Sequence, residues 1–260
     1  MIAALLAFLV WAAPQTGEAL VVLGLDEVHR EPPRAREGEP SFEYWDHVVG
    51  LGSYSGVYLG DRWILTAAHV GAREARLRGM RFPADPESEI DLRTDFIPAD
   101  LVLFRLREDP GLPALPIATE SPLLGDEVLL VGWGRAAGEP FEWEGRRGHR
   151  WGAGPPTRRW GRNVIHRRGM QSRMKGYLTN TFGTRFDTGI ATARATQAAQ
   201  GDSGGAVFLR TREGWALGGV LLMIRRLPAQ PPNTAVSGNE TYSADLVSYR
   251  DQIEAITNSR

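Results

Sequence analysis

The chain contains no cysteine in its 260 residues. No disulfide can brace the fold, although small exported domains often depend on such bridges. The hydrophobic core must therefore stabilise the protein unaided. With 42% hydrophobic residues, a chain of this length can bury a large core, either as one domain or as two barrel-like halves that share a cleft.

The sequence also has almost no net charge, with a formal value of −1 at pH 7. A balance this close to zero gives no bulk affinity for nucleic acid or for an anionic membrane surface. We therefore expect no specific nucleic-acid partner.

The apolar run at the amino terminus is too short to span a membrane, which takes about 20 residues. It extends from Ile2 to Ala13 and ends at Pro14. Small residues follow at Gly17-Glu18-Ala19, where a signal peptidase would cut. Residues 1–19 are therefore predicted to be a signal peptide, cleaved after Ala19, of a secreted or periplasmic protein. A buried amino-terminal strand is the alternative.

One serine is crowded by glycines, in the run Gln200-Gly201-Asp202-Ser203-Gly204-Gly205. Glycine has no side chain, so it leaves the serine hydroxyl and the nearby backbone N–H groups open to a ligand. Such a run suits a nucleophile, although Gly-Ser-Gly runs also form ordinary turns.

A histidine and an aspartate lie upstream of this serine. His69 follows the run Leu65-Thr66-Ala67-Ala68, and Asp100 opens the apolar run Leu101-Val102-Leu103-Phe104. A buried carboxylate is costly without a partner, and His69 is the partner that we expect. A serine nucleophile needs an imidazole to take its proton and a carboxylate to orient that imidazole. His69, Asp100 and Ser203 are therefore the predicted catalytic residues.

With its histidine, aspartate and serine in this order, the chain resembles the trypsin/chymotrypsin-like serine protease family. The resemblance is carried by Trp63-Ile64-Leu65-Thr66-Ala67-Ala68-His69, by Asp100 to Leu106, and by Val131-Gly132-Trp133-Gly134. Animal members usually carry several disulfides, one of them beside the catalytic histidine, where this chain has Val70. The lack of cysteine therefore indicates a bacterial-style member.

The resemblance implies an all-β fold of two antiparallel six-stranded β-barrels. The active site would lie in the cleft between them, and a C-terminal helix would pack on the second barrel. Short apolar runs punctuated by glycine, proline and acidic residues agree with this fold. The expected boundaries are 20–260 for the protease domain, about 20–124 and 125–243 for the barrels, and about 244–257 for the helix. Ser243 is its expected N-cap.

The resemblance assigns two further roles beside the serine. The backbone N–H groups of Gly201 and Ser203 would form the oxyanion hole. Asp202 would form an activation ion pair with a newly cut amino terminus, and the segment Val21-Val22-Leu23-Gly24 is similar to the family's mature start. No lysine or arginine precedes that segment, so the signal peptidase or a trimming enzyme would supply the amine. A turn stabilised by local N–H groups is the alternative role for Asp202.

The resemblance also indicates the primary specificity pocket. Its expected residues are Gln197, Ala198, Gln200, Leu222, Met223, Ile224 and Glu240. An uncharged Gln197 at the base argues against a simple preference for arginine or lysine, and a branched Ile224 at the edge narrows the pocket in favour of small apolar side chains. Glu240 would restore a preference for basic residues if it pointed into the pocket. Both preferences stay open, with the small apolar one favoured.

The segment from Arg146 to Arg185 is rich in arginine and has no acidic residue. It could bind an anionic ligand such as a glycan, a nucleic acid or an acidic substrate. A solvated surface insertion that partly pairs with the acidic stretch Asp85 to Asp95 is the alternative, and we favour it.

Together these features predict a secreted serine endopeptidase that cleaves protein or peptide substrates through an acyl-enzyme, without cofactor or metal. A catalytically weak or inactive homologue that acts as a binding module is the alternative. A serine esterase of the α/β-hydrolase class would carry its histidine after the serine, and no histidine follows Ser203.

Overall fold

The structure of the chain is a computed structural model that describes residues 20–22, 27–188 and 196–259. The predicted signal peptide, residues 1–19, lies outside the described residues, and so do Leu23 and Gly24 of the predicted mature start.

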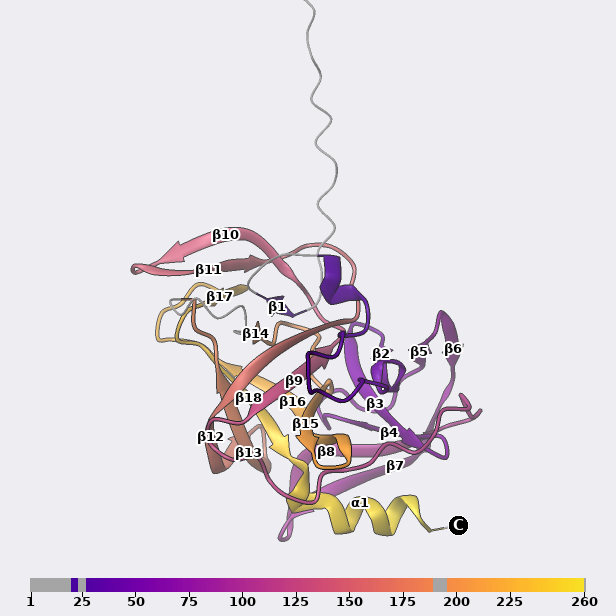
Figure 1. The fold of residues 1–260 in the computed structure, drawn as a ribbon. Helices are drawn as coiled ribbons and strands as arrows, with labels where there is room; N and C mark the ends of the chain where they lie inside the picture. Colours follow the sequence, from indigo (N-terminus) through magenta and orange to yellow (C-terminus); the bar gives the residue numbers. More distant parts are fainter. Residues whose placement is uncertain (1–19, 23–26, 189–195, 260) are drawn as a thin grey trace, which may run out of the picture.

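The N-terminal half is a seven-stranded antiparallel sheet in the order β6-β5-β2-β3-β4-β8-β7 (Figure 1). Its strands are β2 Val48–Leu51, β3 Tyr54–Gly60, β4 Trp63–Thr66, β5 Ala75–Leu77, β6 Met80–Phe82, β7 Ala84–Thr94 and β8 Ile97–Leu106. β4 and the apolar centre of β8 pair with each other and are buried. Their nearly unbroken apolar sequence is typical of strands that are covered on both faces.

The C-terminal half is a closed barrel of six strands in the order β12-β13-β18-β16-β15-β9. Its strands are β9 Glu127–Gly132, β12 Arg159–Met174, β13 Tyr177–Arg185, β15 Ala206–Thr211, β16 Gly214–Arg225 and β18 Glu240–Asp245. The predicted all-β fold of two barrel-like halves is confirmed. Among the described strands, the N-terminal half differs in detail, because it has seven strands and its edge strands β6 and β7 do not pair with each other.

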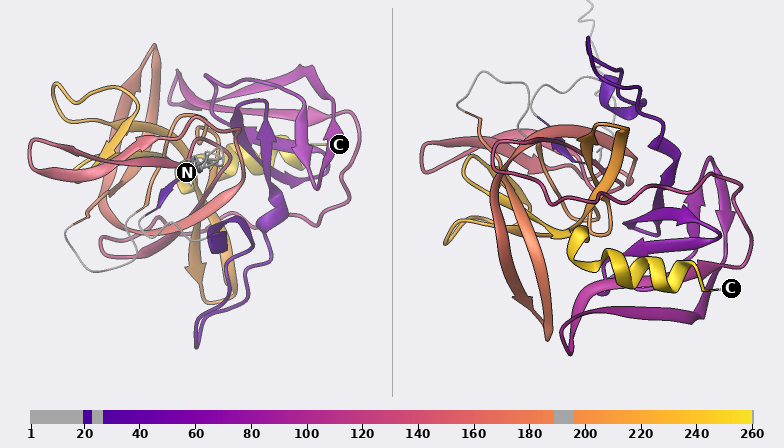
Figure 2. Two further views of the ribbon diagram at one scale, coloured as in Figure 1. Left: turned by 90° about the horizontal axis from the view of Figure 1, so that it is seen from above. Right: turned by 60° about the horizontal axis from the view of Figure 1, so that its bottom comes forward.

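Two small sheets lie beside the barrel (Figures 1 and 2). One has the order β10-β11-β17, from Ala137–Trp143, Arg146–Trp151 and Thr234–Val236. The other pairs β1, Val21–Val22, with β14, Thr196–Gln197. The first of these sheets was not predicted, and it supplies one wall of the cavity described below.

The chain ends in a 3₁₀ turn, η3 Leu246–Tyr249, and a helix, α1 Arg250–Thr257. Two predictions about this helix are wrong. Ser243 lies within strand β18 and cannot cap a helix that begins at Arg250. The helix also lies against the N-terminal sheet (Figure 2), where the Gln252 side chain accepts a hydrogen bond from Arg93 N–H at 3.0 Å and donates one to the Arg93 carbonyl at 2.8 Å.

One large hydrophobic cluster joins the two halves. It contains Ile64 and Leu103 of the N-terminal sheet, Leu217 of the barrel, and Tyr249 and Ile253 at the carboxyl end. This shared core takes the place of disulfides in holding the halves together. Two further 3₁₀ turns precede the sheet, η1 Glu27–Arg30 and η2 Trp45–His47. Across the described residues, no helix is both long and apolar enough to cross a membrane.

Candidate active site

The loop that carries Ser203 is held tightly against the N-terminal sheet. The Ser55 N–H donates to the Ser203 carbonyl at 3.0 Å, and the Ser55 hydroxyl donates to the Gly201 carbonyl at 2.9 Å. Gly201 and Gly204 have positive φ angles of 98° and 86°. A Cβ at Gly201 would come 2.5 Å from the Ser53 carbonyl, and one at Gly204 would collide with the backbone of β3. Only glycine fits at these two positions.

His69 and Asp100 meet at the edge of the N-terminal sheet. His69 follows the end of β4 by three residues, and Asp100 lies in β8, which pairs with β4 through Thr66 and Val102. The two carboxylate oxygens of Asp100 lie 2.8 and 3.0 Å from His69 Nδ1, and the His69 backbone N–H donates to the same carboxylate at 3.0 Å. Asp100 is almost fully buried, with 1% of its surface exposed. These hydrogen bonds supply the partner that a buried carboxylate needs.

Ser203 lies on the other half of the molecule, close to β4. Its neighbour Gly204 packs against the side chain of Thr66, three residues before His69. In the described structure the Ser203 hydroxyl donates to the Leu222 carbonyl at 3.3 Å and forms no hydrogen bond with His69. The His69–Asp100 contact is therefore formed, and the Ser203 hydroxyl is turned to another acceptor.

Asp202 is fully buried behind the serine loop. Its carboxylate accepts hydrogen bonds from the N–H groups of Gly134 at 2.9 Å and Ala199 at 2.7 Å, and also from the backbone of Leu20. Burial raises the pKa of Asp202 to about 7, although these hydrogen bonds act in the opposite direction. Leu20 is itself buried, and the next residue, Val21, pairs with Gln197. The start of the described chain thus inserts beside the serine loop.

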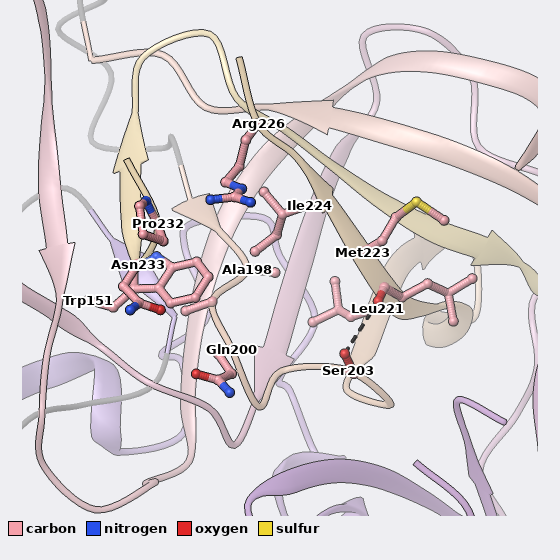
Figure 3. A pocket seen from close by; sticks show the side chains of 12 residues that line it. Trp151, Ala198, Gln200, Ser203, Leu221, Met223, Ile224, Arg226, Pro232 and Asn233 are labelled. Carbon is pink, nitrogen blue, oxygen red and sulfur yellow. Dashed lines mark hydrogen bonds between the residues drawn. The ribbon is translucent and has the colours of Figure 1, made fainter. Parts of the chain in front are cut away.

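A cavity of about 340 Å³ opens next to Ser203 (Figure 3). It is lined by Trp151, Ala198, Ala199, Gln200, Ser203, Leu221, Leu222, Met223, Ile224, Arg226, Pro232 and Asn233. A volume of this size suits a side chain or a small ligand. Most of the predicted pocket residues therefore line this cavity, Ile224 among them.

Two predicted pocket residues do not line this cavity. Gln197 is fully buried, and among the described residues its side-chain amide has no hydrogen-bond partner. Glu240 is buried in a cluster in which Arg167 Nε lies 3.1 Å and Arg225 Nη1 3.5 Å from its carboxylate, and the Tyr242 hydroxyl donates to it at 2.6 Å. Burial opposes ionisation of Glu240, but the hydrogen bonds from Tyr242 and Arg167 outweigh it and lower the pKa.

The sequence interpretation missed two prominent lining residues. Arg226 follows Ile224 by two positions, so the alternation of side chains at a strand end could have indicated it. Trp151 comes from the β10–β11 hairpin, and no local sequence pattern places that hairpin beside the serine.

The basic segment is not one exposed surface. Arg158, Arg159 and Arg162 are largely buried. The acidic partners of Arg158 and Arg162 lie outside the predicted stretch Asp85 to Asp95. Arg158 pairs with Asp46 at 3.0 Å, and Arg162 pairs with Glu39 at 2.6 Å and with Glu127 at 2.8 Å. Binding of an anionic ligand by the remaining exposed arginines stays a prediction, which retention on heparin would test. Within the described ranges, no group of three or more histidine, aspartate and glutamate side chains could hold a metal ion.

Comparison with known proteins gives a consistent picture. The sequence profile of the trypsin-like peptidase domain family matches residues 54–218. Among solved structures, the chain is similar to neuropsin, a serine protease expressed in the limbic system of mouse brain, with 17% sequence identity and a TM-score of 0.57 over 84% of this chain and 98% of that one. Kallikrein-related peptidase 10 is similar at 16% identity and a TM-score of 0.52, over 84% of this chain and 100% of that one. No curated protein matches the sequence.

Proposed function

The chain belongs to the trypsin-like peptidase domain family, and on this basis we propose that it is a secreted serine endopeptidase with Ser203 as its nucleophile. The family and the fold support a hydrolase of the serine protease class that acts on peptide substrates. One observation carries the assignment of the residues: the imidazole of His69 is hydrogen-bonded to the buried carboxylate of Asp100, beside the glycine-held loop of Ser203.

The proposed reaction uses this pair to activate the serine. His69 donates its Nδ1 proton to Asp100 in a hydrogen bond, which leaves Nε2 as a proton acceptor. The 3.3 Å contact from Ser203 to Leu222 is long for a hydroxyl donor, so it costs little to break, and the proposed reaction requires that the hydroxyl then turns to His69. The oxygen then attacks the peptide carbonyl as Nε2 takes the proton. Nε2 passes that proton to the leaving amine, and water hydrolyses the acyl-enzyme.

The backbone N–H groups of Gly201 and Ser203 are proposed to stabilise the tetrahedral intermediate. Within the described structure neither N–H donates a hydrogen bond to the protein, so both can donate to a substrate oxygen. In another protease, removal of one such donor costs about 10²–10³-fold in kcat. The positive φ of Gly201 belongs to the loop shape in which these two donors have no acceptor within the described protein.

Cleavage after Ala19 would both remove the export signal and create the activating amine. The Leu20 backbone already reaches the Asp202 carboxylate in the full chain. Cleavage between Ala19 and Leu20 would convert this amide into an ammonium group and place it against a buried carboxylate. This geometry supports the predicted activation ion pair, and it requires no lysine or arginine before the cut.

The pocket supports an apolar contact with the substrate side chain and argues against a basic one. Ala198, Leu222 and Ile224 give it apolar walls. Glu240, the residue that would have favoured lysine or arginine, is neutralised by Arg167 and Arg225 outside the cavity.

Labelling with a fluorophosphonate tests the proposal. We expect the mature protein to be labelled at Ser203, and we expect Ser203→Ala to abolish both labelling and peptide hydrolysis. Thr211→Ala removes an exposed hydroxyl at the end of β15 and serves as the control that should keep both. Absence of labelling in a folded protein would favour the binding-module alternative, and ester turnover without peptide turnover would favour an esterase.

A further inference from the structure

Among the described residues that line the cavity beside Ser203, Arg226 is the one side chain that carries a charge, and none is a carboxylate. Figure 3 shows Arg226 at the end of the cavity opposite Ser203, with its guanidinium group directed into the cavity past Ile224. A side chain that enters from the scissile bond therefore meets a positive charge at its far end.

The charge of Arg226 is not neutralised by a neighbour. Across the residues that the structure describes, no ion pair or hydrogen bond involves Arg226, whereas the adjacent Arg225 pairs with Glu240 at 3.5 Å. The Glu240 carboxylate also accepts a hydrogen bond from Arg167 Nε at 3.1 Å, and it lies outside the cavity. The nearest carboxylate on this strand pair is thus occupied by other cations, and Arg226 keeps its donors for a ligand.

The rest of the cavity suits the stem of an acidic side chain. Ala198, Leu222 and Ile224 offer apolar contact to methylene groups, and the amide groups of Gln200 and Asn233 offer further hydrogen bonds to an oxygen. A guanidinium group binds a carboxylate through parallel N–H···O bonds, which is the strongest form of this contact.

We propose that the pocket recognises an acidic residue, glutamate above aspartate, immediately before the cleaved bond. The inference rests on the proposed peptidase function. Glutamate is the better fit because Arg226 lies at the end of the cavity opposite Ser203, and the glutamate side chain extends one methylene group further toward it than aspartate does. This substrate class replaces the small apolar residue that the sequence favours.

The test uses peptides that differ only at the residue before the cut, which is glutamate, aspartate, glutamine, valine or arginine. We expect the mature protein to cleave the glutamate peptide with a kcat/KM about tenfold above that of the glutamine peptide at low salt, from one charge-assisted hydrogen bond. Because Arg226 is solvent-exposed, this ratio should shrink as salt is added.

Variants separate the role of Arg226 from general effects of charge. Arg226→Gln should bring the glutamate-to-glutamine ratio close to one, and Arg226→Glu should make the arginine peptide the better substrate. Arg212→Gln removes the same charge from the β15–β16 turn and should leave the ratio unchanged. An unchanged ratio in Arg226→Gln, or a wild-type preference for valine, would overturn the inference.

Fluorophosphonate labelling distinguishes the two possible failures. A wild-type protein that is folded but is not labelled at Ser203 overturns the proposed peptidase function. A protein that is labelled normally but shows no glutamate preference overturns the specificity alone. Labelling of each variant at the wild-type rate shows that its serine loop is intact.

Discussion

Both carboxylate oxygens of Asp100 lie within hydrogen-bonding distance of a single imidazole nitrogen. This arrangement leaves one tautomer of His69 available to accept a proton. Asp100→Asn would allow the amide to hold the ring in the opposite tautomer, so we expect kcat to fall by about 10⁴-fold with little change in fold. Steady-state kinetics and a thermal melt check this prediction. A loss smaller than tenfold would show that Asp100 does not orient the base.

Asp202 predicts a dependence of stability on pH. Burial holds its pKa at about 7 in the full chain, well above the value of about 3.9 for an unfolded aspartate. The folded state therefore binds the extra proton between these values, and stability should fall by a few kcal/mol as the pH rises from about 4 to about 7. A neighbouring ammonium group would favour the charged carboxylate and remove this loss.

Thermal melts at pH 5 and pH 7.5 test the Asp202 prediction in three proteins. Between pH 5 and pH 7.5, the melting temperature of the full chain should fall more than that of a protein that begins at Leu20. Asp202→Asn in the full chain should abolish that relative loss. If the melting temperatures of the full chain and of its Asp202→Asn variant changed equally between the two pH values, Asp202 would not be the source of the pH dependence.

At the scale of the elements, strand β1 directly follows Leu20 and connects it to the segment before the serine loop by pairing with β14. A protein that begins at Ala19 would displace the amine by one residue, or about 3.3 Å along a strand. We expect its kcat/KM to be at least tenfold below that of a protein that begins at Leu20, because the ion pair with Asp202 would be lost. Amino-terminal sequencing of each purified form, combined with peptide hydrolysis, checks this. Equal activity of the two forms would exclude activation through β1.

The sequence allowed the central elements to be predicted, because their signals are local. Each of the three predicted catalytic residues, His69, Asp100 and Ser203, lies in or next to an apolar or glycine-rich run that the sequence shows directly. The sheet of β10, β11 and β17 could not be predicted, since Gly148 pairs with Val236 far along the chain and the polar strand β11 carries no clear alternation. Glu240 was misjudged for a similar reason: its direction depends on arginines from two other strands.

At the scale of the whole molecule, Arg158 links the two halves. It donates hydrogen bonds to the carbonyls of Trp45 at 2.9 Å and Val48 at 3.1 Å, pairs with Asp46, and lies over the rings of Trp45 and Trp133. Arg158→Met would remove these charge-assisted contacts, although the Trp45 carbonyl keeps the Val48 N–H and Asp46 keeps Arg78, and we expect it to lower the free energy of unfolding by about 2–3 kcal/mol. Urea unfolding measures the change, with the exposed Arg168→Met as the control. A change within about 0.5 kcal/mol, the usual range for surface substitutions, would show that the link is dispensable.

One hydrophobic cluster contains Val21, Phe186, Ala199 and Ala235, and Trp151 of the cavity wall packs against it. An exopeptidase that trims the mature protein past Leu20 would loosen this cluster while the larger shared core stays intact. We therefore expect an ageing preparation to become less selective among its substrates well before it unfolds.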